Sequence, residues 1–197
     1  MKKVNFFVFL FLLGGIANAN VFEDRAREFC DKGEAEVCTD MGKYYRDGNA
    51  QYQIEKDLTK AIEILGKGCD LGSAEGCNLL GYMYGNAQGT KKDSTKAVGF
   101  YQKACDGGVI AGCFNLGLMY DNGQGTRINN AKAAELYLKA CNGGDDTGCY
   151  NLGMKYYKGE GVAKSVNNAI KYYNKACELK FQGGCEASAR LRSGKTK

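Results

Sequence analysis

The stretch 105–141, CDGGVIAGCFNLGLMYDNGQGTRINNAKAAELYLKAC, contains a pattern that recurs along the whole chain. The ten cysteines form five pairs whose members lie eight positions apart, and the last four pairs begin 36 residues apart. A strict period of this length indicates a repeat array. Even, regularly spaced cysteines predict one disulfide in each repeat. The predicted bridges are Cys30–Cys38, Cys69–Cys77, Cys105–Cys113, Cys141–Cys149 and Cys177–Cys185.

The spacing of the cysteines restricts the local structure. Two residues eight apart in one straight helix lie about 12 Å apart, whereas a disulfide needs Cα atoms within about 7 Å. If the pairs are bonded, the chain must reverse between their members. Glycine, which readily takes the left-handed conformation that ends a helix, lies in each interval at Gly33, Gly72, Gly107-Gly108, Gly143-Gly144 and Gly183-Gly184. Each bridge is therefore expected to join the end of one helix to the start of the next.

Apolar residues at helical spacing precede the first cysteine of each later pair. They predict helices near 58–69, 94–105, 130–141 and 166–177. Each follows a good N-cap residue, namely Asp57, Asp93, Asn129 and Ser165. The second cysteines lie in the first turn of another set of helices, predicted near 35–46, 73–84, 109–120 and 145–157.

The second set of helices carries a glycine four positions after the cysteine, at Gly42, Gly81, Gly117 and Gly153. A glycine inside a helix costs about 1 kcal/mol relative to alanine. Its recurrence in every internal repeat predicts that another helix approaches closely there. The loop glycines Gly89, Gly125 and Gly161 are best explained by turn geometry, because no Gly-Lys-Ser/Thr phosphate-binding sequence follows them.

The repeats define the domain organisation. We expect a solenoid over 20–197, with a half-repeat at 21–34 and full repeats at about 35–72, 73–108, 109–144 and 145–180. A terminal half-repeat at 181–192 completes the array, and the two half-repeats are expected to cover the apolar ends of the stack.

The first 19 residues have the features of a secretory signal peptide. Met1-Lys2-Lys3 precedes an apolar run, which is followed by the cleavage site Ala17-Asn18-Ala19. The run is short for crossing a bilayer of about 30 Å, so no membrane anchor is expected after its removal. A secreted or periplasmic location suits a protein with many disulfides. The net charge of +5 is spread along the chain, which argues against a nucleic-acid partner.

The residues Asn115-Leu116-Gly117-x-x-Tyr120, continuing through Lys139-Ala140-Cys141, resemble the Sel1-like repeat. Cysteines replace two of its usual alanines, a variant that resembles the Helicobacter cysteine-rich protein family. The resemblance covers nearly all of 21–192. It implies a right-handed α/α superhelix similar to tetratricopeptide arrays. It also implies either an exported peptide-binding protein or a penicillin-binding protein with weak β-lactamase activity.

No standard catalytic set supports the enzymatic alternative. A serine β-lactamase needs Ser-x-x-Lys, but lysine does not follow three residues after any serine beyond the signal segment, namely Ser73, Ser94, Ser165, Ser188 and Ser193. The chain has no histidine, which argues against zinc, and the cysteine spacing is unlike that of a redox-active pair. We therefore expect no metal or cofactor, and the catalytic residues of any hydrolysis stay unknown. An unconventional nucleophile, such as a tyrosine or threonine beside a lysine, stays open.

The preferred function is a monomeric scaffold that binds a peptide or protein, with a β-lactam or peptidoglycan-like ligand as the alternative. Stacked helix pairs form an extended concave surface, lined here by the helices that follow the second cysteines. Candidate contact residues on it are Asn115, Asn151, Tyr82, Met83, Leu118, Met119, Met154 and Lys155. The two asparagines can pair with a peptide backbone, but hydrogen bonds within the repeat are the preferred interpretation because both residues recur with the repeat. Tyr84, Tyr120 and Tyr156 are expected to be packing residues.

Overall fold

The computed structural model describes residues 19–194, which fold into ten helices with no strand among them. The signal peptide predicted for 1–19 therefore lies outside the described residues, apart from Ala19. We call the helices that precede a bridge the B helices: α2 (Ala19–Asp31), α4 (Leu58–Asp70), α6 (Ser94–Asp106), α8 (Asn130–Asn142) and α10 (Val166–Glu178). Those that follow a bridge are the A helices: α3 (Ala35–Asp47), α5 (Ala74–Gly85), α7 (Ile110–Asn122), α9 (Asp146–Lys158) and α11 (Gln182–Arg192).

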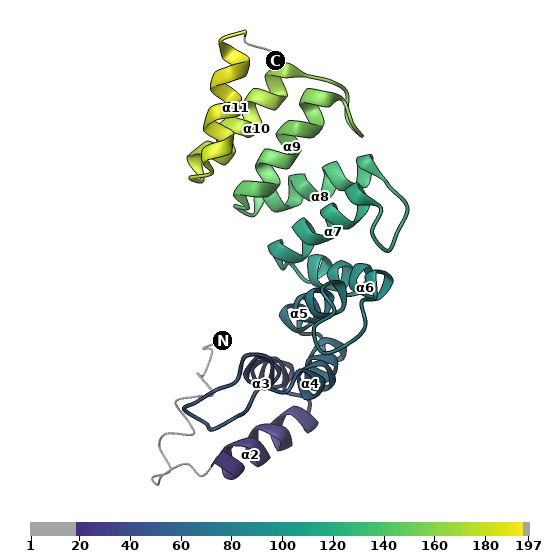
Figure 1. The fold of residues 1–197 in the computed structure, drawn as a ribbon, viewed down its shortest axis with the longest axis vertical. Helices are drawn as coiled ribbons and strands as arrows, with labels where there is room; N and C mark the ends of the chain where they lie inside the picture. Colours follow the sequence, from purple (N-terminus) through teal and green to yellow (C-terminus); the bar gives the residue numbers. More distant parts are fainter. Residues whose placement is uncertain (1–18, 195–197) are drawn as a thin grey trace.

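The helices stack in chain order into an elongated, curved solenoid (Figure 1). Each A helix packs on the B helix before it, and all but α11 also pack on the B helix that follows. The core is therefore a series of small apolar clusters along the array. Such an architecture holds many side chains of the A helices at regular intervals along one side.

The four internal B helices begin where the sequence predicts. Asp57, Asp93, Asn129 and Ser165 each accept a hydrogen bond from a backbone N–H in the first turn of their helix. These N-caps satisfy donors that have no partner within the helix. The predicted bounds of the A and B helices agree with the structure to within about two residues.

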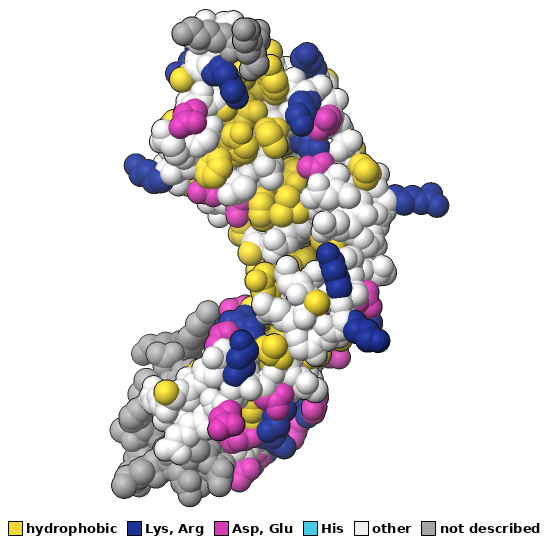
Figure 2. Space-filling model, in the orientation of Figure 1, with side chains coloured by type: hydrophobic (Ala, Val, Ile, Leu, Met, Phe, Trp, Pro, Cys, Tyr) yellow, Lys and Arg dark blue, Asp and Glu magenta, His cyan; other side chains and the backbone are white. Residues whose placement is uncertain are grey.

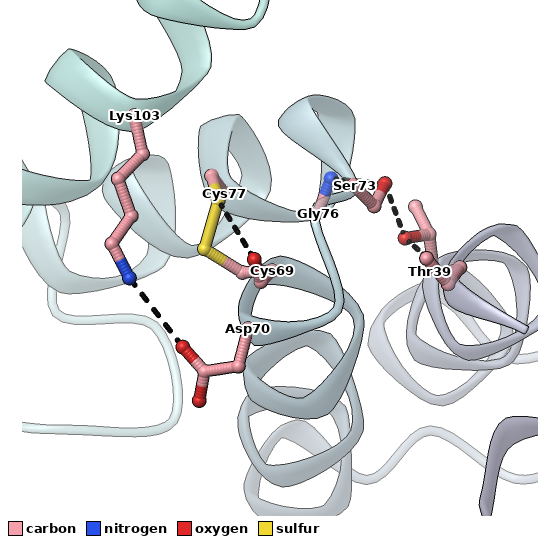
Figure 3. The surroundings of a disulfide bond; sticks show 8 residues. Thr39, Cys69, Asp70, Ser73, Gly76, Cys77 and Lys103 are labelled. Carbon is pink, nitrogen blue, oxygen red and sulfur yellow. Dashed lines mark hydrogen bonds and ion pairs between the residues drawn. A yellow bond between two sulfur atoms is a disulfide. The ribbon is translucent and has the colours of Figure 1, made fainter. Parts of the chain in front are cut away.

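All five predicted disulfides are present, and they join Cα atoms that lie 4.5–4.9 Å apart. Each bridge links the end of a B helix to the first turn of the next A helix, as expected. Figure 3 shows the Cys69–Cys77 bridge between two contacts that cross from one repeat to the next. On one side Lys103 pairs with Asp70 at 3.4 Å, and on the other Thr39 donates to Ser73 at 2.7 Å.

The reversal inside each bridged loop uses one residue with positive φ, three positions after the first cysteine. Glycine takes this conformation at Gly33, Gly72, Gly108 and Gly144, with φ between 85° and 99°. The prediction for the last interval was wrong, because Lys180 adopts φ 75° there. Gly183 and Gly184 lie instead inside α11. An alanine Cβ at 184 would lie 2.8 Å from the Cβ of Ala176, so this glycine lets α11 approach α10.

The glycines inside the A helices do mark close helix contacts. A Cβ at Gly81, Gly117 or Gly153 would lie 2.7–2.8 Å from the ring of a tyrosine on the following B helix. At Gly42 it would lie 2.4 Å from the side chain of Leu65. A side chain at these positions would push the two helices of a repeat apart.

The two ends of the array differ from the internal repeats. In the first repeat, the longer loop is closed by two backbone hydrogen bonds between Asn49 and Ile54, and the Ile54 side chain is buried. The half-repeat helix α2 is held to α3 by the Tyr45 hydroxyl, which donates to Glu23. At the other end, α11 covers α10 with the buried Ala187, which packs near Tyr173.

Candidate binding face

The A helices follow one another along the array, and in Figure 1 α3 and α5 lie on the inner side of its bend. In the same orientation, Figure 2 shows hydrophobic side chains gathered at the hollowed waist by α5 and α7 and again over α9 and α11. Residues five positions after the second cysteine occupy the same place on successive A helices. They are Lys43, Tyr82, Leu118, Met154 and Arg190. We call this row the A-helix face.

The central part of the A-helix face is apolar and accessible. Tyr82 is 45% exposed, which makes it one of the few large hydrophobic residues at the surface of the described chain. Leu118 and Met154 are half-buried. Leu118 packs near Tyr137, and Met154 packs near Tyr173. Packing on one side therefore holds both side chains in place, while the other side is accessible. These three predicted contact residues therefore lie where a ligand can reach them.

The prediction of groove exposure was wrong for Met83, Met119 and Lys155, which are 0%, 6% and 4% exposed. All three lie six positions after the second cysteine. This position is one residue after the A-helix face, which corresponds to a rotation of about 100° around the helix. Its side chains therefore point toward the core between the helices. The two methionines are core residues.

Lys155 is buried because it is paired. Its ammonium group bonds to Asp121 on α7, to Asn130 Oδ1 at 3.0 Å on α8, and to Glu160 Oε2 at 3.0 Å after α9. The Tyr137 hydroxyl donates to the other oxygen of Asp121 at 3.1 Å. A buried charge is tolerated when it has such partners. The cluster ties three consecutive helices together.

The two asparagines are half-buried. The Asn151 side chain lies beside the Tyr137 hydroxyl, which favours a role within the repeat over contact with a ligand. Tyr84 and Tyr156 stack on Phe100 and Tyr172 with ring centroids 5.5 and 5.4 Å apart. This packing is what we expected of the repeated tyrosines.

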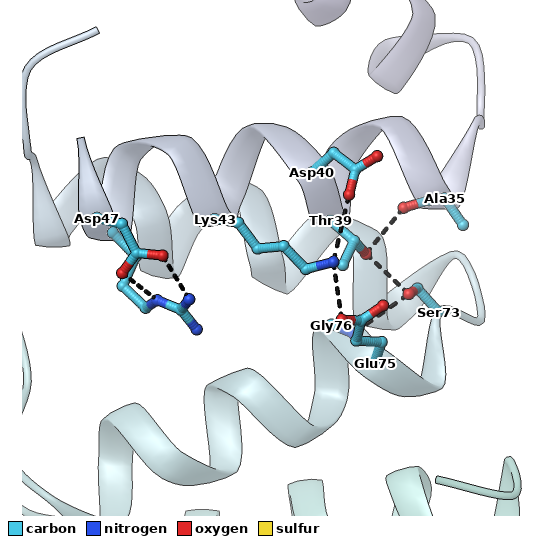
Figure 4. A network of polar contacts seen from close by, with 9 residues as sticks. Ala35, Thr39, Asp40, Lys43, Asp47, Ser73, Glu75 and Gly76 are labelled. Atoms are coloured by element: carbon cyan, nitrogen blue, oxygen red, sulfur yellow. Dashed lines mark hydrogen bonds and ion pairs between the residues drawn. The ribbon is translucent and has the colours of Figure 1, made fainter. Parts of the chain in front are cut away.

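The N-terminal end of the A-helix face is charged (Figure 4). Lys43 pairs with Asp40 at 3.3 Å and with Glu75 of the next A helix at 2.7 Å. Arg46 and Asp47 form a further pair. The face thus changes from paired charges on α3 to apolar side chains on α5, α7 and α9.

Two serines of the described chain are buried and take part in hydrogen bonds within the repeats. Ser73 is buried, and its hydroxyl accepts from Thr39 and from the Gly76 N–H. The Ser188 hydroxyl donates to the carbonyl of Cys185. Tyr137 lies beside Lys155, but burial and the neighbouring Asp121 raise the pKa of its hydroxyl, which opposes formation of a phenolate. Within residues 19–194, no group of His, Cys, Asp and Glu side chains could hold a metal ion.

The repeat pattern matches the Sel1 repeat model over residues 35–73, 74–109, 110–145 and 147–181. The chain belongs to the Sel1 repeat family. The matched segments run from one A helix through the next B helix, so they agree with the repeats seen in the structure.

Solved structures support the same assignment. The chain is similar to c5321, a protective antigen of uropathogenic Escherichia coli strains, with a TM-score of 0.80 and 29% identity over 87% of this chain. It spans 36% of that protein's length. It is 37% identical to Helicobacter pylori cysteine-rich protein B over 66% of this chain and 94% of that one, with a TM-score of 0.53. These similarities confirm the right-handed α/α superhelix expected from the resemblance.

A Sel1 repeat protein from Oxalobacter formigenes shares the fold at 20% identity, with a TM-score of 0.77 over 95% of this chain and 83% of that one. Comparison with curated protein sequences found no significant match. Among the helices described, none is both long and apolar enough to cross a membrane.

Proposed function

We propose that this chain is an exported, disulfide-stapled scaffold whose A-helix face binds an extended segment of a peptide or protein. The observation that carries the proposal is the row Tyr82, Leu118 and Met154, which is apolar yet accessible on three consecutive A helices. Two positions before this row, every internal repeat from α5 onward has a buried leucine. This core position thus keeps leucine in three repeats, while the accessible row varies, as a specificity surface would.

The proposed location rests on the bridges and on the predicted leader. Five disulfides within the described chain suit an oxidising compartment. The similarity to a cysteine-rich protein of Helicobacter pylori and to a protein described as a protective antigen is consistent with this location. We infer that the mature chain acts in the periplasm or outside the cell.

The β-lactamase alternative gains no support from the geometry. Ser73 and Ser188 are buried, with hydroxyls engaged in structural hydrogen bonds, and Tyr137 is held in its protonated form. A fluorescent penicillin incubated with the oxidised protein should therefore leave no label after denaturation. A stoichiometric covalent adduct on a defined residue would support the alternative instead.

Peptide display against the oxidised chain tests the binding proposal. A selected peptide is expected to lose about tenfold in affinity or more on Tyr82→Ala or Leu118→Ala, because central apolar residues dominate such interfaces. Ile128→Ala is the matched control, since Ile128 is exposed and apolar but lies in the loop before α8. If selected peptides respond to the control and not to Tyr82 or Leu118, the A-helix face is not the binding site.

A further inference from the structure

The loops that lead from each A helix to the next B helix form one edge of the solenoid. Each of the later loops packs on the start of the previous B helix, because a Cβ added at Gly125 would collide with the backbone of Ser94, and one at Gly161 with the backbone of Asn130. Thr95 also donates to the carbonyl of Gly125 at 3.4 Å. The loops before α8 and α10 lie at the right-hand margin of Figure 1. We call these loops, together with the first turns of α4, α6, α8 and α10, the loop edge.

Two rows of exposed side chains recur along the loop edge. The first row is the residue before each N-cap, and its side chain lies near the glycine that ends the A helix. A Cβ at Gly159 would meet the Cβ of Lys164 at 3.0 Å, and one at Gly123 would meet the Ile128 side chain at 2.8 Å. The second row is the third residue after each N-cap. The rows consist of Lys56, Lys92, Ile128 and Lys164, and of Lys60, Lys96, Lys132 and Asn168, all of them exposed.

The lysines of the second row are held in place without being neutralised. Each ammonium group lies 5.0–5.1 Å from the centroid of a tyrosine ring on the preceding A helix, in the pairs Lys60–Tyr45, Lys96–Tyr84 and Lys132–Tyr120. A ring face attracts a cation but carries no net charge. Within the described chain, the only ion pair of either row joins Lys96 to Asp93 at 3.9 Å. An external anion can therefore reach these ammonium groups.

The opposite edge, which holds the bridged loops, has paired charges instead. Lys67 pairs with Asp31 at 3.1 Å and Lys103 with Asp70 at 3.4 Å, in each case between consecutive B helices. The residue after the first cysteine of every pair is an aspartate, an asparagine or a glutamate. The modest net charge of the chain thus conceals an asymmetry, because the lysines without an acidic partner are gathered on the loop edge.

Apolar side chains are exposed among these lysines. Ile128 is 64% exposed in the first row, and Val166 is 43% exposed two residues after Lys164. They are two of the four large hydrophobic residues that stand out at the surface of the described chain. Lysines together with protruding apolar side chains suit the interface of an anionic bilayer, where the cations meet lipid phosphates and the apolar groups leave water. A purely anionic polymer would pair with the lysines and leave Ile128 in water.

We propose that the loop edge binds the surface of a membrane that contains anionic phospholipid, with Ile128 inserted between the headgroups. The lysines of both rows pair with lipid phosphates in this arrangement. The contact is peripheral and needs no membrane-spanning helix. It leaves the A-helix face open, because Tyr82, Leu118 and Met154 lie within the A helices and not in the loops. The inference therefore does not depend on the proposed function.

Sedimentation with vesicles tests the charge of the loop edge, using the oxidised chain from residue 20 onward. Vesicles of equal parts phosphatidylglycerol and phosphatidylcholine should bind it about tenfold more tightly, or better, than phosphatidylcholine alone. The triple variant Lys92→Gln, Lys132→Gln and Lys164→Gln should bind about a hundredfold more weakly, since each lysine near an anionic surface accounts for about fivefold. The matched control removes the same charge from the bridged edge and should change binding by less than about fivefold. It carries Lys67→Gln, Lys103→Gln and Lys139→Gln.

Fluorescence tests the insertion. The chain has no tryptophan, so Ile128→Trp introduces a single reporter. Its emission should shift to shorter wavelength on the phosphatidylglycerol vesicles and be quenched by brominated lipid. Leu71→Trp is the matched control, because Leu71 is 45% exposed in a bridged loop, and its emission should not change.

Three results would overturn the proposal. The first is equal binding to neutral and anionic vesicles, and the second is an equal loss of binding in the two triple variants. The third is an unchanged emission of Ile128→Trp on sedimented vesicles. Tighter binding to soluble poly-glutamate than to vesicles, without that emission shift, would assign the loop edge to an acidic protein instead.

Discussion

At the scale of single residues, the sequence places a residue on the correct helix more reliably than on the correct side of it. Met83 and Tyr82 are adjacent, yet one is fully buried and the other is 45% exposed. The apolar periodicity locates the core positions to within about one residue. At that precision, it does not decide whether the residue next to a core position points toward the core or toward solvent. Lys155 was harder still to predict, since its partners come from three different segments.

Lys155→Met tests whether the buried cluster stabilises the junction between α7, α8 and α9. Methionine occupies the equivalent position at Met83 and Met119, so the side chain fits. The substitution leaves Asp121 without its cation, and we expect the free energy of unfolding to fall by about 2 kcal/mol. Adding Asp121→Asn should recover part of that loss. Urea denaturation measures both, with the exposed Lys158→Met as control, and equal stability of Lys155→Met and wild type would contradict the expectation.

The buried tyrosines predict how stability depends on alkaline pH. Burial raises the pKa of Tyr101 and Tyr173 to about 12, compared with about 10 in an unfolded chain. The folded protein holds these protons more tightly than the unfolded chain does. The protonated tyrosines therefore contribute fully to the free energy of unfolding below about pH 10, and this contribution is lost as the pH rises toward 12. Melting temperatures between pH 8 and 12 should fall less steeply for Tyr101→Phe than for wild type. Parallel curves would show that Tyr101 does not contribute.

At the scale of helices, the repeat pattern predicts most of the structure. The N-cap residues and the apolar periodicity predict where the helices begin and end, because both recur at fixed distances from the cysteines in each repeat. The exception is Lys180, which takes the positive φ expected of a glycine. The sequence did not predict this, because the interval contains two glycines, Gly183 and Gly184, and the turn was assigned to them.

A pair of glycine substitutions tests the close approach of the helices. Gly117→Ala would place a Cβ 2.8 Å from the Tyr137 ring, whereas the added Cβ of Gly99→Ala on α6 would meet nothing within 4 Å. Both gain the helix propensity of alanine, about 1 kcal/mol. We therefore expect Gly99→Ala to stabilise the protein and Gly117→Ala to destabilise it in thermal melting. The same sign for both would argue against tight packing at Gly117.

At the scale of the whole molecule, the bridges compensate for the absence of a single large core. A closed loop of about nine residues contributes roughly 2.5 kcal/mol in the chain-entropy model. Five bridges can thus match the net stability of a typical domain, about 5–15 kcal/mol. Of these bridges, only Cys177–Cys185 joins two cysteines that are both partly accessible, while the other eight cysteines are buried.

Reduction should therefore begin at the C-terminal bridge and lower the melting temperature. Limited reduction followed by alkylation and mass spectrometry is expected to label Cys177 and Cys185 first. Complete reduction should lower the melting midpoint by at least ten degrees, roughly the effect of losing a few kcal/mol. An unchanged midpoint after complete reduction would mean that the bridges do not support the array.

Hydrogen–deuterium exchange with a displayed peptide bound to the oxidised chain tests the binding proposal most directly. The A-helix face predicts slower exchange in α5, α7, α9 and α11, centred on Tyr82, Leu118 and Met154, with little change in the outer B helices. Protection confined to the B helices, or to the loops between repeats, would contradict the assignment of the binding site to the A-helix face.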